Sequence, residues 1–216
     1  MTINEYRVVT SWNVSASAEE LARIVSHPED LTHWWPAVFL RAQPLGDSRE
    51  FHVGSVVTFE TKGWLPYTLT FQGCVQELVY PRKCIVLVWG DFEGQLHCEV
   101  LEDGPRCKIR FDWRVRVEKP LVRRLSFLLK PLFYSNHLWV MVRGWQSLKI
   151  ELARRRLRES GDLYRGVAPP QPTFPYGPRY RWLRSFVLQC LNERSVYRQL
   201  RWPQGRKERR AENHRH

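Results

Sequence analysis

The first segment of the chain alternates apolar and polar residues, and the segments after it change to helical spacing. The period-two positions at the start are Tyr6, Val8, Thr10, Trp12 and Val14. Such alternation predicts a half-buried strand. A capping-box pattern at residues 17–20 predicts a short helix after it, which His27-Pro28 ends. Pro28 suits the start of a second short helix, which ends by Pro36 because proline disfavours helical geometry in the residue before it.

Between Val53 and Glu118 the chain consists of strand-like runs separated by turn residues. The turn residues are Gly54, Gly63, Pro66, Pro81, Gly90, Gly94 and the pair Gly104-Pro105. Runs of this kind between such turns predict an antiparallel meander. Each run has one apolar and one polar face, so we expect the sheet to bury mainly one side.

After Pro120 the spacing of the apolar residues becomes helical. The stripe consists of Leu138, Met141, Val142, Trp145, Leu148 and Leu152. Pro131 lies upstream of this stripe, and we expect it to separate a short helix from the long one. Gly144 in the middle of the long helix costs about 1 kcal/mol relative to alanine, which indicates close approach of the sheet or of a ligand.

The charges divide the chain into two parts. Residues 1–152 carry 18 basic and 17 acidic side chains, whereas residues 153–216 carry 16 and 5. We therefore expect a nearly neutral ligand-binding domain at 1–158 and a basic, proline-containing tail at 159–216, with an amphipathic helix at 181–200. Two interpretations of this helix remain open: its apolar face packs on the domain itself or on a partner subunit, or the basic helix lies on an anionic membrane surface. Nucleic acid ranks last because no nucleic-acid-reading module is present.

The sequence lacks the motifs that usually mark membrane spans, metal sites and cofactor sites. Its longest apolar run, Cys84 to Trp89, is far shorter than the roughly 18 residues of a spanning helix. No signal-peptide pattern precedes the first strand, so we expect a cytoplasmic protein, with peripheral membrane contact through the tail. Five cysteines without a C-x-x-C pair indicate neither a disulfide framework nor a zinc ribbon. With phosphate-binding glycine loops and H-E-x-x-H also absent, we expect no metal and no cofactor.

The element order and three short sequences carry a resemblance to a known superfamily. The sequences are LTHWWP at 31–36, FDWRV at 111–115 and NHLWVM at 136–141. Over residues 3–157 the chain resembles the polyketide cyclase/dehydrase-like branch of the START-related (SRPBCC) superfamily. The resemblance implies an α+β helix-grip fold, in which a curved antiparallel sheet wraps around a long C-terminal helix, with two short helices after the first strand. It also implies a cavity for lipids, polyketides or sterols, but not one particular reaction.

One hairpin places candidate acid–base residues opposite each other. If Glu102 and Cys107 flank its turn, the antiparallel register sets His97 opposite Asp112. Two interpretations remain open. These side chains lie on a solvated, charge-paired outer face, or they line the cavity, where a His–Asp pair exchanges protons with a substrate.

Two functions follow from the resemblance and the residues. The first is binding or transport of a hydrophobic, lipid-like or polyketide-like molecule in a cavity between the sheet and the long helix. The second is a polyketide cyclase or dehydratase that uses an acid–base pair in the same cavity, and its weak catalytic candidates are His97, Asp112 and His137. We expect the adjacent indoles of Trp34 and Trp35 to face different ways, one at the cavity mouth. The expected ligand contacts are Trp35, Tyr67, Phe71, Trp113, Asn136, His137, Val140 and Gly144.

Overall fold

Seven strands form one curved antiparallel sheet, and a 40-residue helix follows them. The computed structural model describes residues 5–46, 50–65, 68–116 and 120–173. The expected tail helix at 181–200 lies outside the described residues. In chain order the elements are β1 (Glu5–Val14), α1 (Ala18–Val25), the 3-10 helix η1 (Pro28–Asp30), α2 (Leu31–Trp34), β2 (Phe39–Leu45), β3 (Val56–Lys62), β4 (Thr68–Val79), β5 (Lys83–Gly90), β6 (Glu93–Asp103), β7 (Arg106–Arg116) and α3 (Pro120–Glu159).

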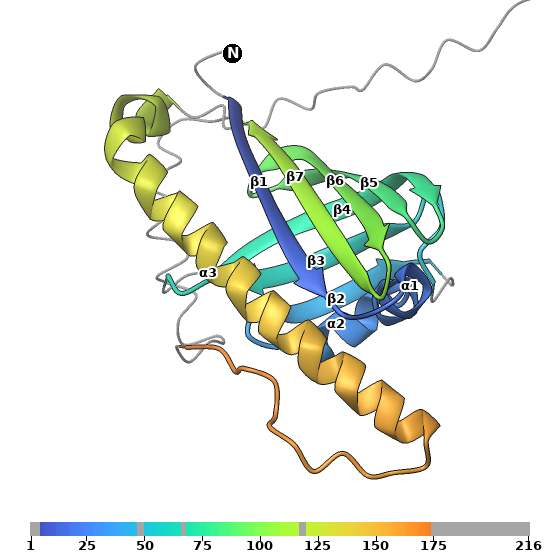
Figure 1. Ribbon diagram of the computed structural model, residues 1–216. Coiled ribbons are helices and arrows are strands. Elements are labelled where there is room, and N and C mark those ends of the chain that lie inside the picture. Colours follow the sequence, from blue (N-terminus) through green and yellow to red (C-terminus); the bar gives the residue numbers. More distant parts are fainter. Residues whose placement is uncertain (1–4, 47–49, 66–67, 117–119, 174–216) are drawn as a thin grey trace, which may run out of the picture.

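The sheet has the strand order β1-β7-β6-β5-β4-β3-β2, so only β1 pairs with a strand distant in sequence. β1 runs antiparallel to β7, with Val14 opposite Cys107 and Val8 opposite Trp113. Figure 1 shows α3 (yellow to orange) running diagonally past β1 (dark blue). The curved sheet, the two short helices after β1 and the long closing helix confirm the α+β helix-grip prediction.

Two details of the elements differ from the sequence prediction. The strand β2 was not predicted, and it contains Pro44. A proline is tolerated there because β2 is an edge strand and needs fewer ladder hydrogen bonds. Pro131 does not divide the helix, since α3 is continuous from Pro120 to Glu159. A proline removes the hydrogen bond of its own nitrogen, and the bonds of the surrounding turns keep the helix together.

Side-chain burial confirms the predicted strand face at the N-terminus and part of the predicted helix stripe. On β1, Trp12 and Val14 are buried, and in α3 Met141, Leu148 and Leu152 are buried. The stripe is narrower than predicted. Leu138 and Val142 are 38% and 52% exposed, because the face of α3 that meets the sheet runs through Gly144 and Ser147 instead.

Polar contacts attach α3 to the rest of the fold at several points. Trp145 Nε1 donates a hydrogen bond to the carbonyl of Asn13 at 3.0 Å, so the helix covers the edge strand β1. Near the C-terminal end of α3, Arg156 pairs with Glu20 and donates to the carbonyl of Ser15. These contacts fix the position of the helix against β1 and α1. No helix in the described part of the chain is long and apolar enough to cross a membrane.

Candidate functional site

Aromatic side chains form a continuous row on the concave face of the sheet. Neighbouring ring centroids along this row lie 4.8 to 6.3 Å apart. The row consists of Trp34, Trp35, Phe39, Phe59, Phe71, Phe92 and Trp113. Trp12 joins it from β1, with its ring centroid 5.4 Å from that of Trp35. The interior wall that faces α3 is therefore largely aromatic, as small-molecule sites commonly are.

The helix approaches this wall most closely at Gly144. A Cβ atom at this position would lie 2.6 Å from Cε2 of Trp35 and 2.7 Å from Cη2 of Trp12. Only a residue without a side chain fits there, so the helix backbone rests directly on the two indoles. This geometry agrees with the close approach to the sheet that the mid-helix glycine predicts.

Trp34 and Trp35 are both buried in the core, with 2% and 8% of their surfaces exposed. Their rings stack at a centroid distance of 5.5 Å and an interplanar angle of 30°. The prediction that the two indoles face different ways is therefore wrong. The chain leaves the helical conformation at Trp35, whose φ and ψ are −124° and 51°, and this turns its side chain toward that of Trp34.

Several buried polar atoms around this wall have no hydrogen-bond partner among the described residues. They are Oγ1 of Thr10, Nε1 of Trp12, Trp34 and Trp35, Nε2 of His137 and Oγ of Ser147. Their residues lie on β1, on α3, and at the end of α2 or directly after it. Buried polar groups are normally hydrogen-bonded, because an unsatisfied one costs about 1–3 kcal/mol. These six atoms are thus enclosed by the protein without a hydrogen-bond partner among the described residues.

The surroundings of His137 change the titration of its imidazole. Burial lowers the pKa of its imidazole from 6.5 to about 4, because a charged ring loses more hydration than a neutral one. His137 is therefore neutral near pH 7. A neutral imidazole accepts a proton or a hydrogen bond through one nitrogen and donates through the other.

The other expected ligand contacts have different environments. Phe71 is buried and Trp113 partly buried in the aromatic row, and Val140 packs against the core from α3. Asn136 instead ties α3 to the chain between β3 and β4, since its Oδ1 accepts a hydrogen bond from the backbone N–H of Leu65 at 3.3 Å. Tyr67 lies outside the described residues.

The structure reveals interior residues that the sequence analysis did not select. Trp12 and Thr10 were recognised only as members of a strand pattern, and Ser147 not at all. Its position three residues after Gly144, one helical turn along the same face, was the available signal. Lys62 was also missed. It is only 3% exposed at the end of β3, and burial lowers the pKa of its ammonium group.

A second concave region lies on the opposite, outer face of the sheet. It has a volume of about 150 Å³ and is lined by Arg7, His97, Glu99, Arg110, Asp112 and Arg114. The predicted register is confirmed, because His97 lies opposite Asp112 and Glu99 opposite Arg110. Positions on β7 alternate between faces, and the buried Ile109 identifies the concave side. His97 and Asp112 consequently lie on the charge-paired outer face, the first of the two interpretations.

His97 and Asp112 do not form a pair. Nε2 of His97 contacts Oε1 of Gln95 at 2.8 Å, whereas Asp112 accepts hydrogen bonds from the guanidinium of Arg7, one of them from Nε at 2.8 Å. The hydrogen bonds from Arg7 lower the pKa of the Asp112 carboxyl group. Arg7 was missed because the pairing of β1 with β7 joins segments more than a hundred residues apart.

The partly buried thiols of Cys84 and Cys98 lack the character of nucleophiles. Cys84 and Cys98 lie opposite each other on β5 and β6, and burial raises their pKa values to about 11 and about 12. No group of three or more His, Cys, Asp or Glu side chains among the described residues is arranged to hold a metal ion.

Comparison with known proteins identifies the fold. No protein-family model and no curated protein matches the sequence. Among solved structures, TTHA0849 from Thermus thermophilus is similar, with a TM-score of 0.54 and 15% identity over 72% of this chain and 99% of that chain. A START superfamily protein from Mycobacterium smegmatis has a TM-score of 0.50 and 18% identity over 69% and 98%. Protein Ms6760 from the same organism has a TM-score of 0.50 and 12% identity over 69% and 92%. The chain thus has a START-like helix-grip fold.

Proposed function

We propose that the chain binds a hydrophobic small molecule, lipid-like or polyketide-like, between the concave face of the sheet and α3. The observation that carries this proposal is the set of unpartnered buried polar atoms within an aromatic wall. A mostly apolar surface with a few fixed polar groups is the usual composition of a small-molecule site. The apolar wall supplies affinity, and the polar atoms orient the ligand.

The polar atoms also indicate the chemistry of the ligand. Indole nitrogens donate hydrogen bonds and cannot accept them, and three of the unpartnered atoms are the indole nitrogens of Trp12, Trp34 and Trp35. A complementary ligand therefore carries acceptor oxygens, as carbonyl and ether groups provide. A purely hydrocarbon ligand would leave these donors unsatisfied.

A cyclase or dehydratase is the second candidate, and His137 is the observation that favours it. Burial keeps its imidazole neutral near pH 7, which allows it to act as a general base. His97 and Asp112 lie on the outer face and do not serve this role in the interior. An enzyme of this kind would lose turnover but retain ligand binding when His137 is replaced by asparagine.

Native mass spectrometry of the full chain purified from its source organism tests the binding proposal, followed by organic extraction of any adduct. We expect an adduct of lipid or polyketide mass that disappears on denaturation. The variant Val140→Trp adds bulk where Val140 packs against the core and should lower occupancy several-fold. Val142→Trp is the matched control, because Val142 is 52% exposed on the same helix. Absence of an adduct, together with no uptake of the apolar probe anilinonaphthalene sulfonate, would contradict the proposal.

A further inference from the structure

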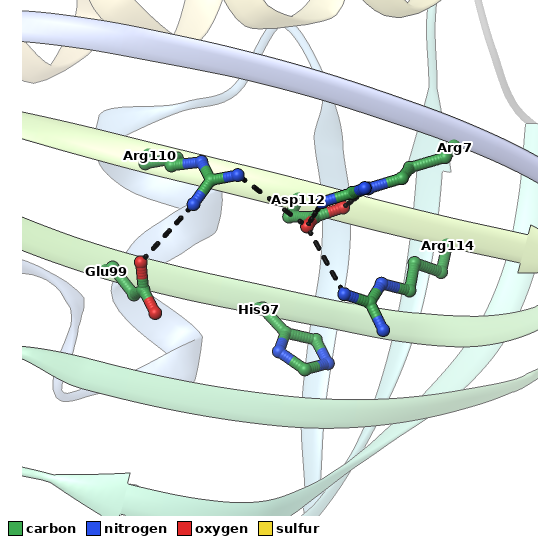
Figure 2. Close-up of a pocket in the computed structure, with 6 residues that line it drawn as sticks. All are labelled: Arg7, His97, Glu99, Arg110, Asp112 and Arg114. Atoms are coloured by element: carbon green, nitrogen blue, oxygen red, sulfur yellow. Dashed lines mark hydrogen bonds and ion pairs between the residues drawn. The ribbon is translucent and has the colours of Figure 1, made fainter.

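Two neighbouring strands, β1 and β7, bring three arginine side chains to one point of the outer sheet face. Alternation along β7 places Arg110, Asp112 and Arg114 on this face. β1 adds Arg7, which lies opposite Arg114, and β6 adds Glu99 opposite Arg110. Figure 2 shows the guanidinium groups of Arg110 and Arg114 on either side of the Asp112 carboxylate.

The arginines differ in how fully their donors are used. Arg7 forms two hydrogen bonds with Asp112, whose side chain is only 8% exposed, so these two charges largely neutralise each other. Arg110 approaches Glu99 at 3.7 Å and Asp112 at 4.0 Å, and Arg114 approaches Asp112 at 3.5 Å. These separations are longer than those of good charge-assisted hydrogen bonds. Each guanidinium has five N–H donors, so Arg110 and Arg114 retain donors that line the pocket.

The charge and the size of the pocket define what it accepts. Three guanidinium groups face two carboxylates, so these five side chains carry an excess of one positive charge. The volume of about 150 Å³ corresponds to about five water molecules, and a phosphate group has five non-hydrogen atoms. A tetrahedral phosphate can accept hydrogen bonds from two guanidinium forks at once, whereas a carboxylate has two oxygens and fits one fork.

We propose that this outer pocket is a binding site for a phosphate group, in which Arg110 and Arg114 donate to the phosphate oxygens while the Arg7–Asp112 pair forms the base. The carboxylate of Glu99 competes with the anion for Arg110. The site is separate from the interior site, because it lies on the other face of the sheet. Its ligand is either free phosphate or a phosphate monoester on a larger molecule such as a lipid headgroup.

Isothermal titration of the full chain with inorganic phosphate, at constant ionic strength, tests the proposal. We expect saturable binding of one phosphate, weakened about tenfold by Arg114→Gln and by Arg110→Gln, because each removes charge-assisted hydrogen bonds. Arg82→Gln is the matched control. It removes the same charge from an exposed arginine that pairs with Glu102 outside the pocket, and it should change the affinity less than about twofold.

A second pair of variants tests the sign of the electrostatic effect. Glu99→Gln removes the competing carboxylate and should tighten phosphate binding several-fold. Glu77→Gln, which changes the charge equally but pairs with Lys83 outside the pocket, should leave it unchanged. Titration with glycerol phosphate and flotation with phosphatidate vesicles then identify the source of the phosphate group. Preferential binding of glycerol phosphate or of phosphatidate vesicles supports the proposal if the variant Arg114→Gln loses that binding. Lack of saturable binding in every arm, or equal effects of Arg82→Gln and Arg114→Gln, overturns it.

Discussion

The interior residues combine apolar burial with polar atoms that the described fold leaves unsatisfied. His137 and Ser147 illustrate the two consequences of this arrangement, a shifted pKa and an unsatisfied hydroxyl group. Burial makes the charged form of His137 unfavourable and lowers its pKa to about 4, whereas Ser147 is completely buried and keeps a hydroxyl without a partner among the described residues. Both groups reduce the stability of the ligand-free protein. Their retention in the core is understandable if they contact a bound molecule.

His137 makes stability depend on pH in a defined window. Its folded-state pKa of about 4 lies below the unfolded value of 6.5, so the unfolded state binds an additional proton between these values. Stability is fully present above pH 6.5 and falls by about 3 kcal/mol as the pH decreases from 6.5 to about 4. The variant His137→Asn should not show this part of the decrease in stability at low pH. Denaturant midpoints of both proteins at pH 7 and pH 5 measure it, and equal pH dependence of the two would contradict the assignment.

Ser147→Ala should have opposite effects on stability and on ligand retention. Removing an unsatisfied buried hydroxyl should raise the unfolding free energy of the ligand-free protein by about 1 kcal/mol. If the hydroxyl binds the ligand, occupancy in native mass spectrometry should decrease several-fold. Ser135→Ala is the control, since Ser135 is exposed on the same helix and its hydroxyl donates to the carbonyl of Leu132. Unchanged occupancy in Ser147→Ala would remove this residue from the site.

At the scale of elements, the position of α3 depends on a few contacts at its middle and its end. Gly144 allows the helix backbone to rest on Trp12 and Trp35, and the Trp145 indole bonds to the edge of β1. The ion pair between Arg156 and Glu20 then ties its end to α1. Together these contacts set the distance between the helix and the aromatic wall.

Gly144→Ala should destabilise the protein, although alanine favours helices. The gain in helix propensity is about 1 kcal/mol, but the new Cβ would lie 2.6 Å from Cε2 of Trp35. Relief of such overpacking typically costs about 1–3 kcal/mol, so we expect a net loss of about 1 kcal/mol in urea unfolding. A variant more stable than the wild type would show that the glycine is not needed for this contact.

Features that depend on residues close together in the chain could be predicted from the sequence, whereas features that depend on distant residues could not. Period-two alternation, the capping box of Ser17 and the register of His97 with Asp112 are local, and all three are confirmed. The pairing of β1 with β7 is long-range, so the Arg7–Asp112 pair was not foreseen. The stacking of Trp34 on Trp35 depends on one backbone conformation after α2, which residue spacing does not encode. The aromatic wall was predicted in part, through Trp35, Phe71 and Trp113.

At the scale of the whole molecule, the buried hydrophobic core of the described residues ends within α3, at Leu152. Beyond Glu159, the backbone N–H of Asp162 still bonds to the carbonyl of Leu157, but Leu163 and Val167 are 83% and 76% exposed. The excess of basic residues lies in this last part of the chain. Among the described residues, the buried side chains therefore lie before the end of α3, whereas the excess of basic residues lies after Leu152.

A chain truncated after Ser160 should fold by itself. We expect a cooperative thermal transition within about 3 °C of that of the full chain, because residues 161–173 contribute few buried contacts. Truncation after Lys149 is the control. It removes the buried Leu152 and the ion pair of Arg156, so its transition should be strongly lowered or lost. Aggregation or a non-cooperative transition of the Ser160 truncation would contradict the proposed domain of residues 1–158.

The central claim, an acceptor-bearing hydrophobic ligand between the aromatic wall and α3, is tested most directly by the indole N–H signals in ¹H–¹⁵N NMR spectra. Spectra of the full chain are compared before and after organic extraction of its ligand, with signals assigned through single Trp→Phe variants. We expect the signals of Trp12, Trp34 and Trp35 to move, because their N–H groups lack partners among the described residues. The signal of Trp145 should stay in place, since its N–H already bonds to Asn13. Unchanged signals for Trp12, Trp34 and Trp35 would contradict the claim.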